Sequence, residues 1–416
     1  MQIQNADQFF KKFPLSEDGQ YLREQALNRL AQLEFPNKKM ENWKYTSLKE
    51  IDNLELTPAE LNEYLPNHEQ LIGIQKYFKN DFYHLVFFDG KLNETLSSDL
   101  PPTIHIKDCE LEQLNSDDYF TVLNCAYLHK GIQIEVEKNT VVDKPVQIHH
   151  YVSSQNFSVL KNNYLEIIVG QSAQIQFVES FSGAGKYLLN HREKIQLGRN
   201  SFVYWVRLSD HAIHASSVLQ ADFILQADSN LHTLDFIMSG QLQRHEICVQ
   251  LVEAGATAIV NGASILSSNQ HADQQTLIQH LVGNCQTTQL YKNILNDESS
   301  VAFRGQVHIA PDAQKANSEQ LNNNLLLSNK AEANSLPVLE IFADDVKATH
   351  GSTVGQLNKE EYFYLLSRAI SPSLALSMLS FGFVADLVQK LEKPLIIEWL
   401  MPLVKNHFSQ MKVSLQ

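Results

Sequence analysis

The centre of the chain carries a repeat of about 28 residues, and this repeat constrains the fold more than any other feature. Four similar stretches read GQSAQIQF from Gly170, GRNSFVYW from Gly198, ADSNLHTL from Ala227 and AGATAIVN from Ala254. Each is a small-residue corner followed by a strand-like run. One such unit cannot bury its apolar face until the next unit stacks on it. The repeat therefore predicts the coils of a β-helix.

The β region is expected to extend over residues 101–356, where short β-branched and aromatic runs alternate with Gly, Asn, Asp and Ser. Because the repeat is degenerate, a pair of packed sheets remains an alternative. The asparagine-rich stretch from Ala310 to Ser335 is expected to interrupt the last coils as a loop or short crossing, with its NNN run in a solvated loop.

Helical patterns flank this β core. Apolar residues at helical spacing from Ala6 to about Leu33, interrupted by Pro14, open an N-terminal helical domain over residues 1–100. After it, Trp43, Tyr45 and Leu48 indicate a segment packed on something larger. A C-terminal helical domain over residues 357–416 is expected to contain three helices, the second starting after a Ser-Pro signature and the third at a proline. The starting residues of those two helices are Pro372 and Pro394.

Charge and composition exclude several classes of partner. A net charge of −14 without any basic run argues against nucleic acid and anionic membranes. The N-terminus lacks the apolar core of a secretory signal, and no stretch is expected to reach the length of a membrane-spanning helix. A cytoplasmic protein with protein or small-molecule partners is expected. The four scattered cysteines predict free thiols rather than a self-contained zinc or iron–sulfur site, and they are Cys109, Cys125, Cys248 and Cys285.

Several catalytic motifs are missing from the sequence. It has no phosphate-binding loop, nucleophile elbow, zinc-binding helix or dinucleotide fingerprint. The pairs His149–His150 and Asp344–Asp345 are expected to point to opposite faces of a strand, which makes each a poor two-ligand clamp. A β-helix enzyme acting on carbohydrate remains an alternative, with Glu340, Asp344 and Asp345 as the candidate catalytic carboxylates.

The run FADDVKATHGSTVG, Phe342 to Gly355, places His350 in an alternating, strand-like segment. Alternation puts His350 on the more apolar face, together with Val346, Ala348 and Val354. A buried histidine with a satisfied hydrogen bond is the simplest interpretation, and a metal ligand is the alternative.

Two longer stretches then indicate a family. KMENWKYTSLKEI near the start and EIFADDVKATHGSTVGQLNKEEYFYLLSRAISPSLALSMLSFGFVADL near the end, on either side of a repetitive β core, closely resemble the SufB/SufD family of SUF iron–sulfur cluster assembly scaffolds. Gly351 stands where SufB has a glutamate, which favours the SufD branch. The resemblance covers essentially the whole chain.

The resemblance implies a right-handed parallel β-helix flanked by helical domains. It also implies a non-catalytic scaffold subunit that pairs with SufB and docks the ABC-type ATPase SufC in a SufBCD complex. By the same resemblance, His350 contributes a ligand to a transient iron–sulfur cluster at the SufB interface. Ala348 stands where the family often has cysteine, so a thiol role there is lost. A single imidazole cannot hold a cluster that needs about four ligands, so no cluster is expected in the isolated chain.

The C-terminal helices offer more apolar surface than one stripe needs, so they serve either as core or as a docking surface. Under the resemblance they are the expected contact with the ATPase. A structural adaptor that holds the ATPase without touching metal remains an alternative. The sequence leaves open the cluster type, a reduced flavin and a homodimer of the isolated chain. The candidate contact residues are Tyr362, Arg368, Pro372, Leu374, Met378 and Phe381.

Overall fold

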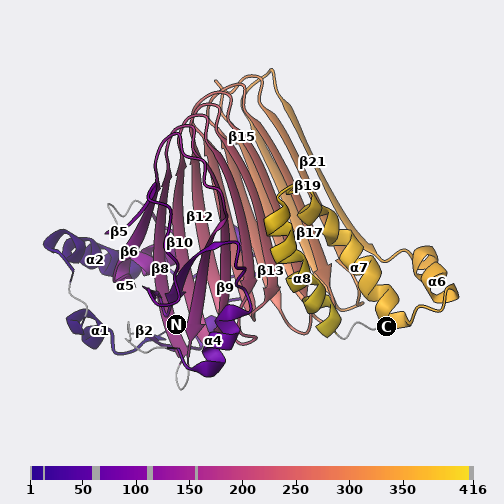
Figure 1. The fold of residues 1–416 in the computed structure, drawn as a ribbon, viewed down its shortest axis with the longest axis horizontal. Helices are drawn as coiled ribbons and strands as arrows, with labels where there is room; N and C mark the ends of the chain where they lie inside the picture. Colours follow the sequence, from indigo (N-terminus) through magenta and orange to yellow (C-terminus); the bar gives the residue numbers. More distant parts are fainter. Residues whose placement is uncertain (1, 13–14, 59–65, 110–115, 155–157, 412–416) are drawn as a thin grey trace.

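The computed structural model describes residues 2–12, 15–58, 66–109, 116–154 and 158–411. Its centre is a β-solenoid of about eight turns, with helical segments at both ends of the chain (Figure 1). Pro14, at which the N-terminal helical pattern was expected to break, lies outside the described residues.

Each turn of the solenoid contributes one strand to each of two sheets, and successive turns pair in parallel. This parallel stacking confirms the β-helix and rules out the sandwich. Sheet A contains β8 (Ser158–Val169), β10 (Tyr187–Leu197), β12 (Ser216–Leu225), β14 (Leu242–Leu251), β16 (His271–His280), β18 (Ser300–Ile309) and β20 (Glu332–Ile341). Sheet B contains β7 (Val146–Ser153), β9 (Gln174–Ala184), β11 (Phe202–Asp210), β13 (Asn230–Ser239), β15 (Thr257–Leu266), β17 (Gln286–Leu295), β19 (Asn317–Leu326) and β21 (Lys347–Gln356).

The backbone conformation of each corner explains why small residues recur there. At one corner of successive turns a residue adopts a positive φ, which Gly, Asn and Asp tolerate best. The next residue is small and fully buried, because the chain turns inward there. The positive-φ residues are Ser172, Asn200, Asp228, Gly255, Asn284 and Lys315. The buried residues that follow them are Ala173, Ser201, Ser229, Ala256, Cys285 and Ala316.

The expectation that Ala310 to Ser335 forms a solvated loop is wrong. Strand β19 includes the NNN run, and Asn322 and Asn324 are buried inside the solenoid. Asn324 donates to the side chain of Asn322 at 2.6 Å and accepts from Asn293 of the preceding turn at 2.9 Å. Amides hydrogen-bond to one another within the strand and between turns, so asparagine can occupy an interior position.

The N-terminal part mixes helices with strands that extend both sheets. Strand β2 pairs with β8 in sheet A, and β3 pairs with β7 in sheet B. Helix α5 was not expected within the β region; it packs beside α2 on the outside of sheet A. The elements are β1 (Gln2–Ile3), α1 (Ala6–Lys12), α2 (Glu17–Leu30), the 3-10 helix η1 (Glu41–Trp43), α3 (Lys49–Asp52), β2 (Glu55–Pro58), α4 (His68–Gln75), β3 (Tyr83–Phe88), β4 (Lys91–Leu92), β5 (Ile104–Cys109), α5 (Tyr119–Tyr127) and β6 (Gly131–Val136).

The three predicted C-terminal helices are confirmed as α6 (Lys359–Ser367), α7 (Pro372–Gln389) and α8 (Pro394–Gln410). Helices α7 and α8 lie against the outer face of sheet B (Figure 1), where Val384 and Leu400 join a cluster with Val206 and Phe236. By length and composition α7 could cross a membrane, with a mean hydropathy of 1.3 over 18 residues, so the expectation that no stretch reaches that length is wrong. Its buried side chains pack on the solenoid.

Candidate functional site

The solenoid ends in two strands that each have one unpaired edge among the described residues. Strand β20 pairs only with β18, and β21 pairs only with β19. No further turn stacks on them, so most of their side chains are at least partly exposed. An uncovered strand edge presents free backbone donors and acceptors, which makes this end a natural place for another chain to pair.

His350 lies on β21, directly opposite the buried Gln320 of β19. Parallel partners share one side of a sheet, so His350 occupies a position that faces the solenoid interior, as the alternation predicts. Its side chain is nevertheless exposed, because no turn follows. The interpretation of His350 as a buried, hydrogen-bonded histidine is therefore wrong.

The imidazole of His350 has no hydrogen bond or ion pair among the described residues. Below it, the Gln320 side chain is buried, and neither its Nε2 nor its Oε1 atom has a partner. The side chains of His350 and Gln320 are thus both available to contact a molecule bound at the open end.

The cysteines supply no thiolate to His350 within the described chain. All four are free; Cys125 and Cys285 are buried, and Cys109 and Cys248 are half-buried. Burial, reinforced by Asp222, raises the pKa of the Cys248 thiol to about 12. The described residues contain one three-residue group close enough to hold a metal ion, and that group includes neither His350 nor a cysteine. A cluster bound at His350 needs its other ligands from elsewhere.

The six candidate contact residues fall into two sets. Tyr362 and Phe381 are half-buried against the cluster that joins α7 and α8 to the solenoid, so they support the surface rather than form it. The other four are exposed: Arg368, Pro372, Leu374 and Met378.

Sequence reasoning missed two neighbours of this set. Phe363 and Tyr364 on α6 are 71% and 57% exposed, which is unusual for aromatic side chains. The guanidinium of Arg368 lies over the Tyr364 ring at 5.2 Å. Adjacent aromatic residues in the stretch EEYFYLL were the available signal. With Leu374 and Met378 they form what we call the α6–α7 apolar surface.

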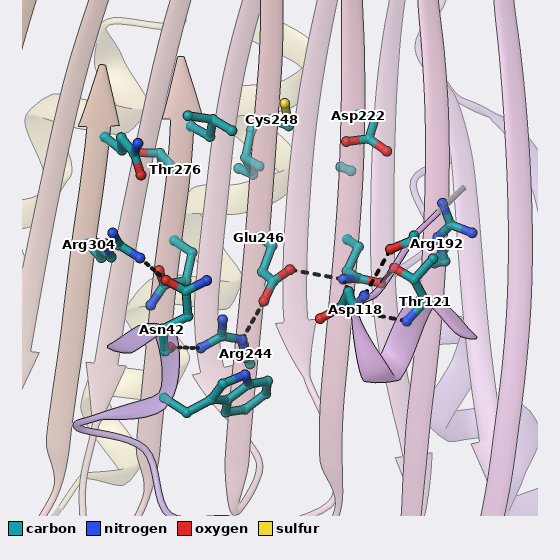
Figure 2. A pocket seen from close by; sticks show the side chains of 18 residues that line it. Asn42, Asp118, Thr121, Arg192, Asp222, Arg244, Glu246, Cys248, Thr276 and Arg304 are labelled. Carbon is teal, nitrogen blue, oxygen red and sulfur yellow. Dashed lines mark hydrogen bonds and ion pairs between the residues drawn. The ribbon is translucent and has the colours of Figure 1, made fainter. Parts of the chain in front are cut away.

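A groove of about 450 Å³ lies on the outer face of sheet A, between η1 and α5 (Figure 2). Its charged groups are largely paired with one another. Arg244 stacks on Trp43 at 3.7 Å and donates to the Asn42 carbonyl at 2.9 Å and to Glu246 at 2.5 Å. These contacts therefore fix the KMENWKYTS segment to the outside of the solenoid, as expected for Trp43.

Comparison with known families decides what kind of scaffold this is. The family model described as "SUF system FeS cluster assembly, SufBD core domain" matches residues 150–383, more than half of the chain. The chain belongs to the SufBD family. The family resemblance seen in the sequence is thus confirmed, and the matched region runs from within β7 into α7.

Similar proteins place this SufBD protein near the SufD branch. It is 27% identical to the iron-sulfur cluster assembly protein SufD of Escherichia coli K12 over 88% of both chains. It is 26% identical to an iron-sulfur cluster assembly SufBD family protein of Synechocystis over 89% of this chain and 86% of the relative. The SufB protein of Bacillus subtilis is 25% identical over 68% of this chain and 61% of its own length.

Proposed function

We propose that this SufBD protein is a non-catalytic scaffold subunit for iron–sulfur cluster assembly in the cytoplasm. It pairs through the open end of the solenoid with a SufB-like subunit, and it docks a SufC-like ABC ATPase on its C-terminal helices. His350 then supplies one ligand to a transient cluster, and the partner supplies the rest. In the isolated chain the same open end could pair two copies.

The observation that carries this proposal is the coincidence of His350 with the uncovered end. Ile341 of β20, Phe342 directly after it and Val354 of β21 are each at least two-fifths exposed. Burying such apolar surface against another chain contributes about 25 cal/mol per Å². An imidazole at the margin of that contact would be placed between two subunits, where a shared ligand belongs.

The proposed ATPase contact is supported by the α6–α7 apolar surface and by the way α7 and α8 hold the solenoid. Lys292 of β17 donates to Asp386 of α7 at 2.7 Å and to the Phe383 carbonyl at 2.9 Å. Trp399 of α8 donates to the Tyr77 carbonyl at 2.7 Å. A subunit bound to these helices could transmit movement to a stiff solenoid.

A structural adaptor without metal contact is the second candidate. Ala348 in place of the frequent cysteine favours it, as does the finding that His350 belongs to no group of three or more potential ligands among the described residues. In that case the open end pairs with the partner, but His350 does no chemistry.

The two candidates separate in a co-expressed complex of this chain with its SufB-like and ATPase partners. His350→Ala should leave the complex and its stability intact, because an exposed side chain changes stability by less than about 0.5 kcal/mol. Iron and sulfide in the purified complex should fall roughly tenfold or more, since the variant loses a direct ligand. His350→Cys, which keeps a ligating atom, should retain more of both than alanine does.

Thr349→Ala is the matched control, because Thr349 is the exposed neighbour of His350 on the opposite side of β21. It should keep the normal iron and sulfide content. A stable His350→Ala complex with normal iron and sulfide would establish the adaptor instead.

A further inference from the structure

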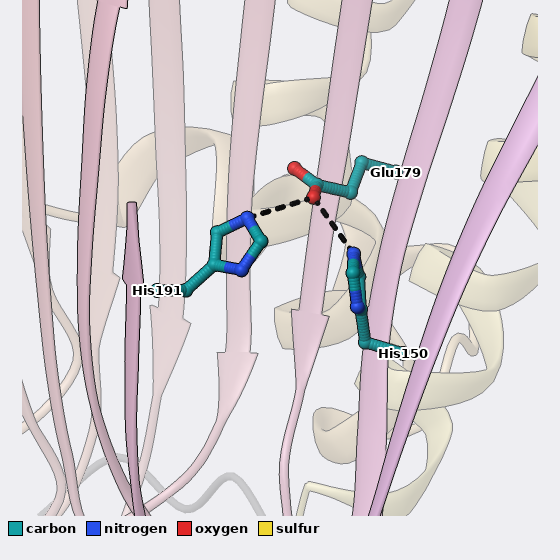
Figure 3. Close-up of side chains that lie close together, drawn as sticks. All are labelled: His150, Glu179 and His191. Atoms are coloured by element: carbon teal, nitrogen blue, oxygen red, sulfur yellow. Dashed lines mark hydrogen bonds and ion pairs between the residues drawn. The ribbon is translucent and has the colours of Figure 1, made fainter. Parts of the chain in front are cut away.

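The interior of the solenoid holds a cluster of ionisable side chains that the proposed function does not use. His150 of β7, Glu179 of β9 and His191 of β10 come from neighbouring strands and converge in the core (Figure 3). Each of the three is less than a tenth exposed. His149 points to the other face of β7, where it contacts the hydroxyls of Ser180 and Ser182, so the two adjacent histidines separate as predicted.

The ligand atoms of these residues already lie close to metal-site spacing. Oε1 of Glu179 lies 3.1 Å from Nε2 of His150 and 3.3 Å from Nε2 of His191. Ligands about 2.0–2.2 Å from a tetrahedral metal ion are separated by about 3.3 Å. The three ligand atoms all lie within 4.8 Å of one another, so only a small movement would complete the arrangement.

Surrounding groups hold the ligands in place. Arg207 binds Oε2 of Glu179 at 2.8 Å and also pairs with Oε2 of Glu193, which leaves Oε1 of both carboxylates turned toward the imidazoles. The His150 ring is stacked between Phe87 and Phe181, with centroid distances of 5.1 and 4.7 Å. Fixed orientation of this kind is what a metal site takes from its surroundings.

The buried carboxylates of the interior also favour the binding of a cation. Glu179, Glu193 and Asp235 are buried carboxylates, and Arg207, which lies beside all three, is their one permanently charged partner in the described core. Asp235 also pairs with His245 at 2.6 Å, and Glu179 and Glu193 share the His191 ring at 3.3 and 2.9 Å. In the metal-free chain a proton on His191 helps to compensate these two carboxylates, because uncompensated buried charge is strongly unfavourable. A divalent ion bound by neutral imidazoles would take the place of that proton and supply the positive charge.

We propose that His150, Glu179 and His191 bind one divalent first-row transition-metal ion inside the solenoid, with Glu193 able to provide a fourth ligand. Two imidazoles and one carboxylate suit ferrous, cobalt and zinc ions, and they do not suit the soft cuprous ion or the oxygen-seeking calcium and magnesium ions. Oε1 of Glu193 lies 2.9 Å from Nε2 of His191. The site is separate from His350, and its existence does not rest on the proposed assembly function.

Cobalt(II) is the probe that tests this site. The full chain, without an affinity tag, is exposed to cobalt both when folded and during refolding from urea, and loosely held ions are then removed by gel filtration. We expect one cobalt per chain, with the visible absorption of a four- or five-coordinate ion. Zinc(II) and anaerobic iron(II) should compete for the same site. Absence of stoichiometric cobalt under both conditions would overturn the proposal without any variant.

Variants then locate the ion. His150→Gln and His191→Gln should each lower the retained cobalt at least tenfold, whereas His149→Gln, a buried neighbour outside the site, should keep it. A double variant of His150 and His191 that retains full cobalt would place the ion on surface histidines and would also overturn the proposal. Neither result depends on cluster assembly, so failure of this site and failure of the proposed function are distinguishable.

Discussion

At the scale of single residues, buried histidines dominate the electrostatics of the solenoid. Burial, with smaller contributions from His150 and His84, lowers the pKa of His149 to about 3. Burial also lowers the pKa of His211 to about 3, assisted by His245. For His191, burial opposes the charged form, but hydrogen bonds to Glu179 and Glu193 outweigh it and raise the pKa to about 9. The pKa values of buried histidines in the same solenoid are therefore shifted in opposite directions.

The lowered values predict sensitivity to acid. The unfolded chain has histidines near the ordinary pKa of 6.5, so between pH 6.5 and 3 it binds protons that the folded His149 and His211 do not bind. Stability from these two rings is present above pH 6.5 and is lost as the pH falls below it. Between pH 7 and pH 5 the free energy of unfolding should fall by about 1–2 kcal/mol for each ring. The measurement is a lower urea midpoint at pH 5.

A variant isolates one of these rings. His211 contacts the Tyr187 hydroxyl at 3.0 Å through Nδ1, and His211→Gln removes its titration while keeping a polar group. The difference in unfolding free energy between pH 7 and pH 5 should shrink by about 1–2 kcal/mol in this variant. An unchanged difference would show that His211 takes no part in the acid response.

At the scale of elements, the sequence predicted what repeats or carries a local signal. The corner of each turn recurs at intervals of 27 to 31 residues, and Pro372 and Pro394 mark helix starts through their own chemistry. The interior cluster has no local signal, because its members meet only when turns stack. A search at the repeat length would have found only Glu179, through its row with Arg207 and Asp235, which are direct partners on successive turns.

Helix α7 presents two surfaces that sequence periodicity could not separate. Leu376, Val384 and Leu387 are buried on the solenoid, whereas Leu374 and Met378, one helical turn apart, are about half exposed. An apolar residue every few positions is compatible with either role, and only the packing against sheet B decides which face remains open.

The exposed face predicts a separation of binding from stability. Replacing both Leu374 and Met378 with glutamate should weaken co-purification of the ATPase at least tenfold, because charge is placed in an apolar contact. The melting temperature should barely change, since both side chains are exposed. Ser373→Glu adds a charge to the same exposed turn and is the control. Unchanged ATPase binding by the double variant would move the contact away from α7.

At the scale of the whole molecule, the two ends of the solenoid differ in how far other elements cover them. The early turns are covered by the N-terminal helices and by strands that extend the sheets, and α7 and α8 cover the outer face of sheet B. Among the residues that the structure describes, neither kind of cover lies on the last turn. A long solenoid with one uncovered end is expected to find a partner there, because free edges and apolar side chains favour association.

Charge at this end should therefore abolish pairing without unfolding the chain. Phe342 and Val354 are 61% and 53% exposed, so Phe342→Glu with Val354→Glu removes little packing in the isolated subunit. In the pair, two carboxylates would be buried without partners, which costs several kcal/mol and corresponds to at least a hundredfold weaker association.

Ile213→Glu, at a 67% exposed apolar residue between β11 and β12, is the matched control. Sedimentation and co-purification with the SufB-like subunit should show pairing by the control and none by the double variant. Pairing that survives in a folded double variant would mean that the partner binds elsewhere on the solenoid.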